Sequence, residues 1–396
     1  MEILKNKLII LLLLFTAPLN FLFSEVISSD VFGYTIDFPE MFQIIDMTED
    51  ERSILFEHQL LPVQAAIKIW PQKSYTNSQE CLKETLGKIA STQDVTGVKW
   101  RNQSCAVSRI QMNEAVLGEK MEGWAVCTPL PQTKDYFVML SYAPENKAYD
   151  CEQFILSLLD SIMIDRGSRR EAGLITTFAF PKRGNKSIEL EIEGEKIKTF
   201  MDEDDAEANQ FVVDREFAVF RLFIDQQCWK EAWQRFYRLI AKDGIGRLKR
   251  PAFDISTALS PACNNADPEN PSAAMAQKLL TWIQGFNYER PSATPDKADF
   301  TNIPATFTGS GSDCDSRSML LMLLLKNMNI DSCMFISVDY SHAMAGVCLE
   351  GKMGQSYTLD EKEYLFGETT AKNVTLGMIA ADMQDRTKWI PVELYD

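Results

Sequence analysis

The stretch GSDCDSRSMLLMLLLKNMNI (Gly311–Ile330) places one cysteine between two aspartates at the start of a long apolar run. Asp313 is a residue type that caps helix N-termini well. Met319–Leu325 would put apolar side chains on every face of a helix, which is typical of a helix buried on all sides. We therefore predict a buried helix that begins at Cys314, where the preceding Gly/Ser loop can open it to solvent.

The position of Cys314 has a chemical consequence. Backbone N–H groups and the helix dipole stabilise an anion at a helix N-terminus, and the pKa of a thiol falls there and beside a protonated histidine. The flanking carboxylates of Asp313 and Asp315 act in the opposite direction, because like charge disfavours the thiolate. A strong nucleophile at this position therefore needs a nearby cation.

His342 is the candidate for that cation, since the chain has two histidines and the other, His58, reads as a structural residue in a strand. We predict a strand over Ser332–Val338, a turn, and a second strand that begins at His342. A further strand leads up to Glu368. Antiparallel neighbours would bring His342 and Glu368 side by side, facing the helix end, with Asp360 as a rival for the acid.

Three motifs, DCDSRSMLLMLLLKNMNI, SHAM and YLFGETT, together resemble the transglutaminase-like superfamily, whose core is papain-like. LLTWIQGFNYE and the Ile-Pro of FTNIPATF also resemble the segment that precedes the family's cysteine, so the resemblance covers Ala273 to Gly377. It implies that Cys314 is the nucleophile, His342 the base and acid, and Glu368 the orienting carboxylate. The family usually has Asp at the last position and an aromatic residue where this chain has Met344.

The N-terminus predicts export. Lys5 and Lys7 precede a short apolar run, Leu8–Phe15, and a small residue follows at Ser24, which is the pattern of a secretory signal peptide over residues 1–24. The run is short for a membrane span, which needs about 20 residues. We predict an exported chain, located in the periplasm, the cell envelope or outside the cell. An uncleaved N-terminal anchor is the alternative, and only this would attach it to a membrane.

Residues 26–165 predict a first α+β sandwich domain. FGYTIDFP alternates like a strand, NSQECLKETLGKIA reads as a helix capped by Asn77 or Ser78, DYFVMLSYA as a buried strand, and CEQFILSLLDSI as a closing helix. The aromatic strand that ends in Phe-Pro resembles the small sandwich domains of the PsbP and Mog1 type.

Residues 171–262 predict a connecting region that follows a linker, RGSRRE. KSIELEIEGEKIKTF alternates like a half-exposed hairpin, and FVVDREFAVFRLFI (211–224) reads as a further strand. CWKEAWQRFYRLIAKD reads as a helix with an aromatic core stripe. DEDDAE lacks a calcium-loop pattern and reads as a solvated acidic loop. After a second boundary, residues 270–396 form the transglutaminase-like domain, so the fold class is α+β multidomain, with the nucleophile helix packed on an antiparallel sheet.

The charge and the cysteine pattern of the chain argue against some classes of function. The net charge of −16 opposes phosphate backbones, so we expect no nucleic-acid partner. The nine cysteines are odd in number, which leaves at least one outside any disulfide of the chain. No CxxC or Cys/His cluster has metal-ligand spacing, so we expect neither a metal nor a cofactor.

The resemblance implies a cysteine enzyme that acts on amide or peptide bonds of a protein or peptide substrate through an acyl-enzyme. We expect a peptidase or amidase rather than amine transfer, and the sequence assigns no substrate-binding residues. Trp282 and Tyr288 read as core packing rather than as the walls of a cleft. Two alternatives stay open: a catalytically inactive envelope protein that binds or scaffolds, and a disulfide-linked adhesin.

Overall fold

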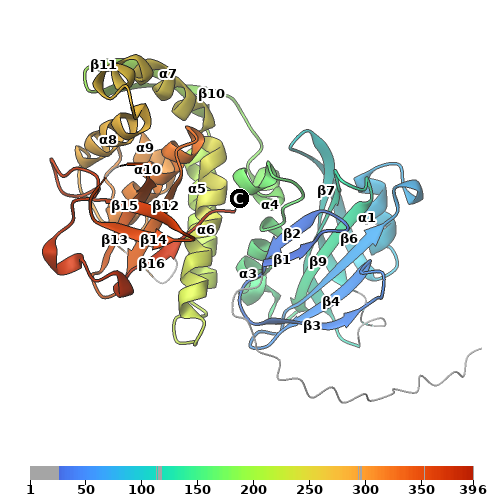
Figure 1. Cartoon of the computed structure of the whole chain (residues 1–396). Coiled ribbons are helices and arrows are strands. Elements are labelled where there is room, and N and C mark those ends of the chain that lie inside the picture. The colour runs from blue at the N-terminus through green and yellow to red at the C-terminus, as the bar shows by residue number, and fades with distance from the viewer. Residues whose placement is uncertain are drawn as a thin grey trace, which may run out of the picture.

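The structure, a computed structural model, describes residues 26–112, 114, 118–292, 294, 297–351 and 353–395. It shows a mixed α/β chain with antiparallel sheets, arranged as two halves on either side of a pair of long helices (Figure 1). The predicted signal peptide, residues 1–24, lies outside the described ranges. Within those ranges, no helix combines the length and the hydropathy that a membrane span requires.

The N-terminal half is built on a seven-stranded antiparallel sheet with the order β3-β4-β5-β9-β8-β7-β6. Helix α1 (Ser78–Leu86) packs on one face, and α3 (Ala148–Asp160) with the β1–β2 hairpin covers the other. Asn77 caps α1 by accepting a hydrogen bond from the Glu80 N–H, as the sequence predicts. The strands are β1 (Val26–Ser29), β2 (Tyr34–Asp37), β3 (Phe42–Met47), β4 (Ser53–His58), β5 (Gln64–Trp70), β6 (Ala90–Trp100), β7 (Gln103–Met112), β8 (Met121–Pro129) and β9 (Tyr136–Pro144).

His58 is a structural residue of this half, as predicted. Its side chain is buried, Nε2 lies 2.9 Å from the Glu40 carbonyl oxygen, and Nδ1 accepts hydrogen bonds from the N–H groups of Leu60 and Leu61. Burial lowers the pKa of His58 to about 4, so the ring stays neutral near neutral pH.

The C-terminal half is built on a five-stranded antiparallel sheet with the order β14-β15-β13-β12-β16. Helix α10 (Cys314–Asn327) packs on one face of this sheet and also contacts α6, α7, α8 and α9, so that every side chain from Met319 to Leu325 is fully buried. The strands are β12 (Ser332–Ser337), β13 (His342–Cys348), β14 (Ser356–Leu359), β15 (Lys362–Gly367) and β16 (Ile390–Val392), and the helices are α7 (Lys249–Ala266), α8 (Pro271–Gln284) and α9 (Ile303–Phe307).

Residues 171–262 are not confined to a connection between the halves. The predicted hairpin is present as β10 (Asn185–Ile192) and β11 (Glu195–Asp202), and it packs into the same core as α10. After α4 (Leu174–Ala179), the helices α5 (Asp205–Phe220) and α6 (Trp229–Arg247) run between the two halves (Figure 1). The C-terminal core therefore begins well before residue 270.

The prediction of a strand over 211–224 is wrong, because most of this segment lies in α5. Its β-branched and aromatic residues suggested a strand. Val212 and Val213 pack into the C-terminal core, Val219 packs into the N-terminal core, and Phe211 contacts both. A helix that buries apolar residues on two sides loses the one-sided periodicity by which amphipathic helices are recognised.

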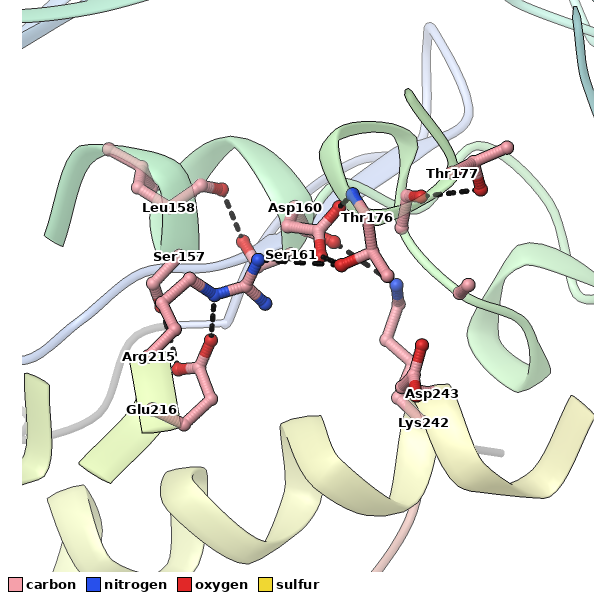
Figure 2. A network of polar contacts seen from close by, with 12 residues as sticks. Ser157, Leu158, Asp160, Ser161, Thr176, Thr177, Arg215, Glu216, Lys242 and Asp243 are labelled. Carbon is pink, nitrogen blue, oxygen red and sulfur yellow. Dashed lines mark hydrogen bonds and ion pairs between the residues drawn. The ribbon is translucent and has the colours of Figure 1, made fainter. Parts of the chain in front are cut away.

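A network of buried charges joins the two halves (Figure 2). Arg215 of α5 contacts Asp160 of α3 at 2.9 Å and Glu216 at 2.7 Å, and the Ser157 hydroxyl donates to Glu216 at 2.7 Å. Burial alone would raise the pKa of the Asp160 carboxyl, but Arg215 and nearby Lys242 outweigh this effect and hold the pKa below its usual value. The network fixes α3 against the central helices.

Arg235 and Arg238 of α6 extend the network to Asp37, at the end of β2. The Arg235 guanidinium donates to the Asp37 carbonyl oxygen at 2.9 Å, and Arg238 contacts the Asp37 carboxylate at 2.8 Å. Tyr395, near the C-terminus, also donates a hydrogen bond to this carboxylate. The face of α6 opposite the C-terminal core thus binds the N-terminal half through charge.

The buried carboxyl group of Glu40 should make the stability of the protein depend on pH. It is 2% exposed, and within the described part of the chain neither carboxylate oxygen has a hydrogen-bond partner. Burial raises its pKa from 4.5 to about 7, against the influence of Arg235. The folded state therefore binds the proton of Glu40 more tightly than the unfolded chain does. The stability that protonated Glu40 contributes is complete at pH values below the pKa of Glu40 in the unfolded chain. It is lost as the pH rises through the pKa of Glu40 in the folded state.

Glu40→Gln, which removes the charge, should therefore raise the Tm by about 2–4 °C at about pH 8 and leave it nearly unchanged at about pH 4.5. Calorimetry at both pH values measures the difference. Glu57→Gln, at an exposed position of neighbouring β4, is the control. An equal effect of Glu40→Gln at both pH values contradicts the prediction.

Candidate active site

Cys314 opens α10 because Asp313 caps the helix. The Asp313 carboxylate accepts hydrogen bonds from the Ser316 N–H at 3.2 Å and the Ser316 hydroxyl at 2.9 Å. Cys314 is 6% exposed, and a backbone hydrogen bond from Ala343 to its sulfur favours the thiolate. Since Ala343 follows His342 in the chain, the start of β13 lies against the start of α10.

The side-chain partner of the thiol is acidic. Cys314 Sγ donates to Asp315 Oδ1 at 3.2 Å, and the other oxygen of Asp315 accepts a hydrogen bond from the hydroxyl of Tyr237 on α6. Burial, followed by the charges of Asp315 and Asp313, raises the pKa of Cys314 above its usual range. Burial and the charge of Asp315 also raise the pKa of Asp313 to about 6. The resting thiol is therefore protonated. Burial and the flanking carboxylates raise its pKa by more than the helix N-terminus lowers it.

His342 and Glu368 are joined by a hydrogen bond at the same end of the sheet. His342 Nε2 lies 2.7 Å from Glu368 Oε2, and both side chains are mostly buried. The other carboxylate oxygen accepts the Thr370 N–H at 2.7 Å and the Thr370 hydroxyl at 2.6 Å. Burial would raise the pKa of Glu368, but the bonds from His342 and Thr370 lower it to about 2. The carboxylate therefore stays ionised near neutral pH.

The rival acid, Asp360, lies elsewhere. It is in the turn between β14 and β15, whereas Glu368 follows β15 directly. A strand of this length separates the two positions by roughly 20 Å, at about 3.3 Å per residue. The structure therefore brings together Cys314, His342 and Glu368 at one end of α10 and the sheet, and leaves Asp360 apart.

Arg317 and Tyr237 are neighbours of the site that the sequence analysis did not single out. Arg317 is buried; its guanidinium donates to the Phe286 carbonyl oxygen at 2.9 Å and lies 5.5 Å from the ring centre of exposed Tyr288. An arginine three positions after the cysteine, directly before the apolar run Met319–Leu325, is a sequence signal for a buried cation near the site. Tyr237 carried no such signal, because its partner is far away in the sequence.

The two aromatic residues before the site differ in their surroundings. Trp282 packs against Phe286 and Phe307, with ring centres 4.9 and 6.0 Å apart, which agrees with core packing. Tyr288 is 58% exposed and lies over Arg317, so the prediction of core packing is wrong for this residue, which is a surface residue beside the nucleophile. On the sheet side, the Trp389 ring centre is 6.4 Å from that of His342.

All nine cysteines are free thiols, and eight of them are buried. Among the described residues, no group of three or more His, Cys, Asp or Glu side chains is arranged to hold a metal ion. Two hollows of about 810 and 830 Å³ lie away from Cys314; one is lined by Trp100, Phe178 and Arg247, among others, and the second by Asn270, Asp331 and Cys348, among others.

Comparison with known proteins assigns no family. No family model matches the chain, and no curated protein matches it. Among solved structures, it is similar to PsbP of the cyanobacterium Synechocystis (10% identity, 38% of this chain and 96% of that chain, TM-score 0.28) and to the Ran-binding protein Mog1p of Saccharomyces cerevisiae (8% identity, 36% and 95%, TM-score 0.28).

A third similar structure comes from Bacteroides thetaiotaomicron, with 12% identity, 55% of this chain and 74% of that chain covered, and a TM-score of 0.22. Structures of the PsbP and Mog1 type are thus among those that resemble this chain, as expected from its N-terminal sequence. TM-scores this low assign no function to it.

Proposed function

We propose that the chain is a transglutaminase-like cysteine enzyme that acts on amide or peptide bonds of a protein or peptide. The observation that carries the proposal is the hydrogen bond between His342 and Glu368 at the strand end that lies against Cys314. Nε2 of His342 is held by the carboxylate, so Nδ1 is the nitrogen that takes the thiol proton. This division of roles is that of a Cys-His-acid triad.

The proposed reaction has two steps. The Cys314 proton moves to His342 as Sγ attacks the carbonyl carbon, the C–N bond breaks, and the imidazolium gives the proton to the leaving amine. Water, deprotonated by His342, then attacks the thioester, so that a carboxylic acid leaves and the thiol takes back its proton. Backbone N–H groups at the start of α10 are suited to stabilise the oxyanion in both steps. An amine in place of water would give amide transfer, and we favour hydrolysis.

A protonated thiol makes the imidazole essential. With the pKa of Cys314 raised, little thiolate forms at neutral pH, and the proton has to be removed during the attack. The same observation supports a second candidate function, a catalytically inactive binding or scaffold protein in which Asp315 keeps the thiol unreactive. We also propose that the chain is exported, on the basis of the predicted signal peptide, and that its acidic surface excludes nucleic acid as a partner.

Trapping the acyl-enzyme tests the proposal. p-Nitrophenyl acetate, an activated acyl ester, should transfer its acetyl group to Cys314, and peptide mass spectrometry should locate it there. Cys348 is the internal control, because it is the most exposed of the nine cysteines and lies away from the site. Acetylation of Cys314 ahead of Cys348, with loss of ester turnover in Cys314→Ser, is the expected result. No acetylation of Cys314 in the folded protein favours the binding function instead.

A further inference from the structure

We propose that Asp315 is a gate on the nucleophile, which holds Cys314 in a resting state, and that Tyr237 is the positioning residue that keeps Asp315 in place. This inference rests on the proposed function and adds the pair of residues that controls it. In the resting state each partner of the reaction is bound to a carboxylate: the thiol to Asp315 and the imidazole to Glu368. Reaction then requires the S–H···Oδ1 bond to break and the proton to pass to Nδ1 of His342.

The geometry makes Asp315 a bridge between two elements. Its two carboxylate oxygens are divided between the Cys314 thiol on α10 and the Tyr237 hydroxyl on α6. Tyr237 is 2% exposed, and its ring is packed against Phe236 and Phe300, with ring centres 4.8 and 6.1 Å away. Because this packing fixes the ring of Tyr237, its hydroxyl oxygen is also held in place beside Asp315. The hydrogen bond between them therefore keeps the carboxylate of Asp315 oriented toward the thiol.

Burial and the charge at Asp315 together keep the thiol protonated in the resting state. Burial raises the pKa of Asp315, and the hydrogen bond from Tyr237 acts against this by favouring the ionised carboxylate. An ionised carboxylate beside the thiol favours S–H over the thiolate. The charged and titratable groups around Cys314, from every element near it, are Asp313, Asp315, Arg317, Tyr237, Tyr288, Arg290, Asp299, His342 and Glu368. Asp315 is the one among them to which the thiol donates its hydrogen bond.

Helix α6 also connects this gate to the N-terminal half. Tyr237 lies between Arg235 and Arg238, both of which bind Asp37 at the end of β2. A shift of the N-terminal half that moves Arg235 and Arg238 would therefore also move Tyr237, the residue that positions Asp315. This arrangement gives the described residues of the N-terminal half a physical route to the nucleophile, although they contribute no residue to the triad.

The pH dependence of Cys314 alkylation by iodoacetamide tests the gate, read peptide by peptide with mass spectrometry on the full-length folded protein. Asp315→Asn should lower the midpoint pH by about one unit or more, which is about a tenfold faster reaction at about pH 7. Tyr237→Phe should shift it in the same direction by a smaller amount, because Asp315 without its donor retains a proton more readily. Tyr364→Phe is the matched control, since it removes a buried tyrosine bond to Asp331, away from the site.

The outcomes separate the gate from the proposed enzyme. A lower midpoint in both variants, with none in Tyr364→Phe, supports the gate; an unchanged or higher midpoint in a folded variant overturns it. If Asp315→Asn does not fold, Tyr237→Phe decides alone. The acetyl-transfer experiment is independent of this measurement. If Cys314 is not acetylated but the alkylation midpoint shifts, the enzyme is refuted and the gate is supported. If Cys314 is acetylated but the midpoint does not shift, the enzyme is supported and the gate is refuted.

Discussion

His342→Ala should lower the rate constant for acylation of Cys314 by about 10²–10⁴-fold, the usual contribution of a general base. The physical reason is the raised pKa of the thiol, which leaves it protonated unless a base removes the proton in the reaction. A cysteine that was already ionised would react without His342. The measurement is the rate of p-nitrophenol release under single-turnover conditions, compared with the wild type.

Glu368→Gln gives the companion measurement. A glutamine in place of the carboxylate still reaches Nε2 of His342, but it no longer stabilises the imidazolium. The rate should fall by a smaller factor than in His342→Ala, and Asp360→Asn should leave it unchanged, because Asp360 lies at the other end of β15. The asparagine is suited to the positive φ of 46° at this position. A loss of activity in Asp360→Asn instead of Glu368→Gln would reassign the acid.

Arg235→Met should lower the free energy of unfolding by about 3–5 kcal/mol, the cost of breaking a buried ion network by removing one partner. The side chain of Arg235 is 2% exposed, and its guanidinium contacts Glu216 at 3.1 Å, Ser157 at 3.0 Å and the Asp37 backbone. The methionine fills much of the volume but leaves the Glu216 carboxylate with fewer donors in a dry interface. Urea unfolding, followed by tryptophan fluorescence and circular dichroism, measures the change.

Arg250→Met is the matched control for this experiment. Arg250 pairs with Asp254 on the surface of α7, and its side chain is 62% exposed. An exposed pair of this kind contributes about 0–1 kcal/mol. We also expect the two spectroscopic transitions of Arg235→Met to separate, because the halves lose a shared contact. A change below about 1 kcal/mol in Arg235→Met would show that the network contributes little.

The sequence predicted those features that depend on neighbouring residues. The cap at Asn77, the hairpin of β10 and β11, and the start of α10 at Cys314 follow from local residue types and periodicity. The approach of Glu368 to His342 followed from the order of strands and turns in one short segment. In each case, the partners lie within one element or within one short segment of the chain, although β14 separates β13 from β15 in sequence.

The features that the sequence missed depend on distant partners. Tyr237 meets Asp315 across 78 positions, and Arg235 meets Asp37 across 198, so no local pattern announces either contact. The helix α5 was mistaken for a strand for a related reason, since its two apolar faces serve two different cores. The sequence indicates that the flanking aspartates disfavour the thiolate, but only the fold determines that Asp315 is the one that accepts the hydrogen bond of the thiol.

The distance along the chain between Asp37 and its arginines has a consequence for biosynthesis. At about 5–20 residues per second, a ribosome needs roughly 10–40 s to pass from Asp37 to Arg235. Throughout this interval the Asp37 carboxylate of the nascent N-terminal half has no arginine partner, because Arg235 and Arg238 are not yet synthesised. The end of β2 therefore has to stay hydrated until α6 emerges, and the first half of the protein reaches its final packing only as the second half is being made.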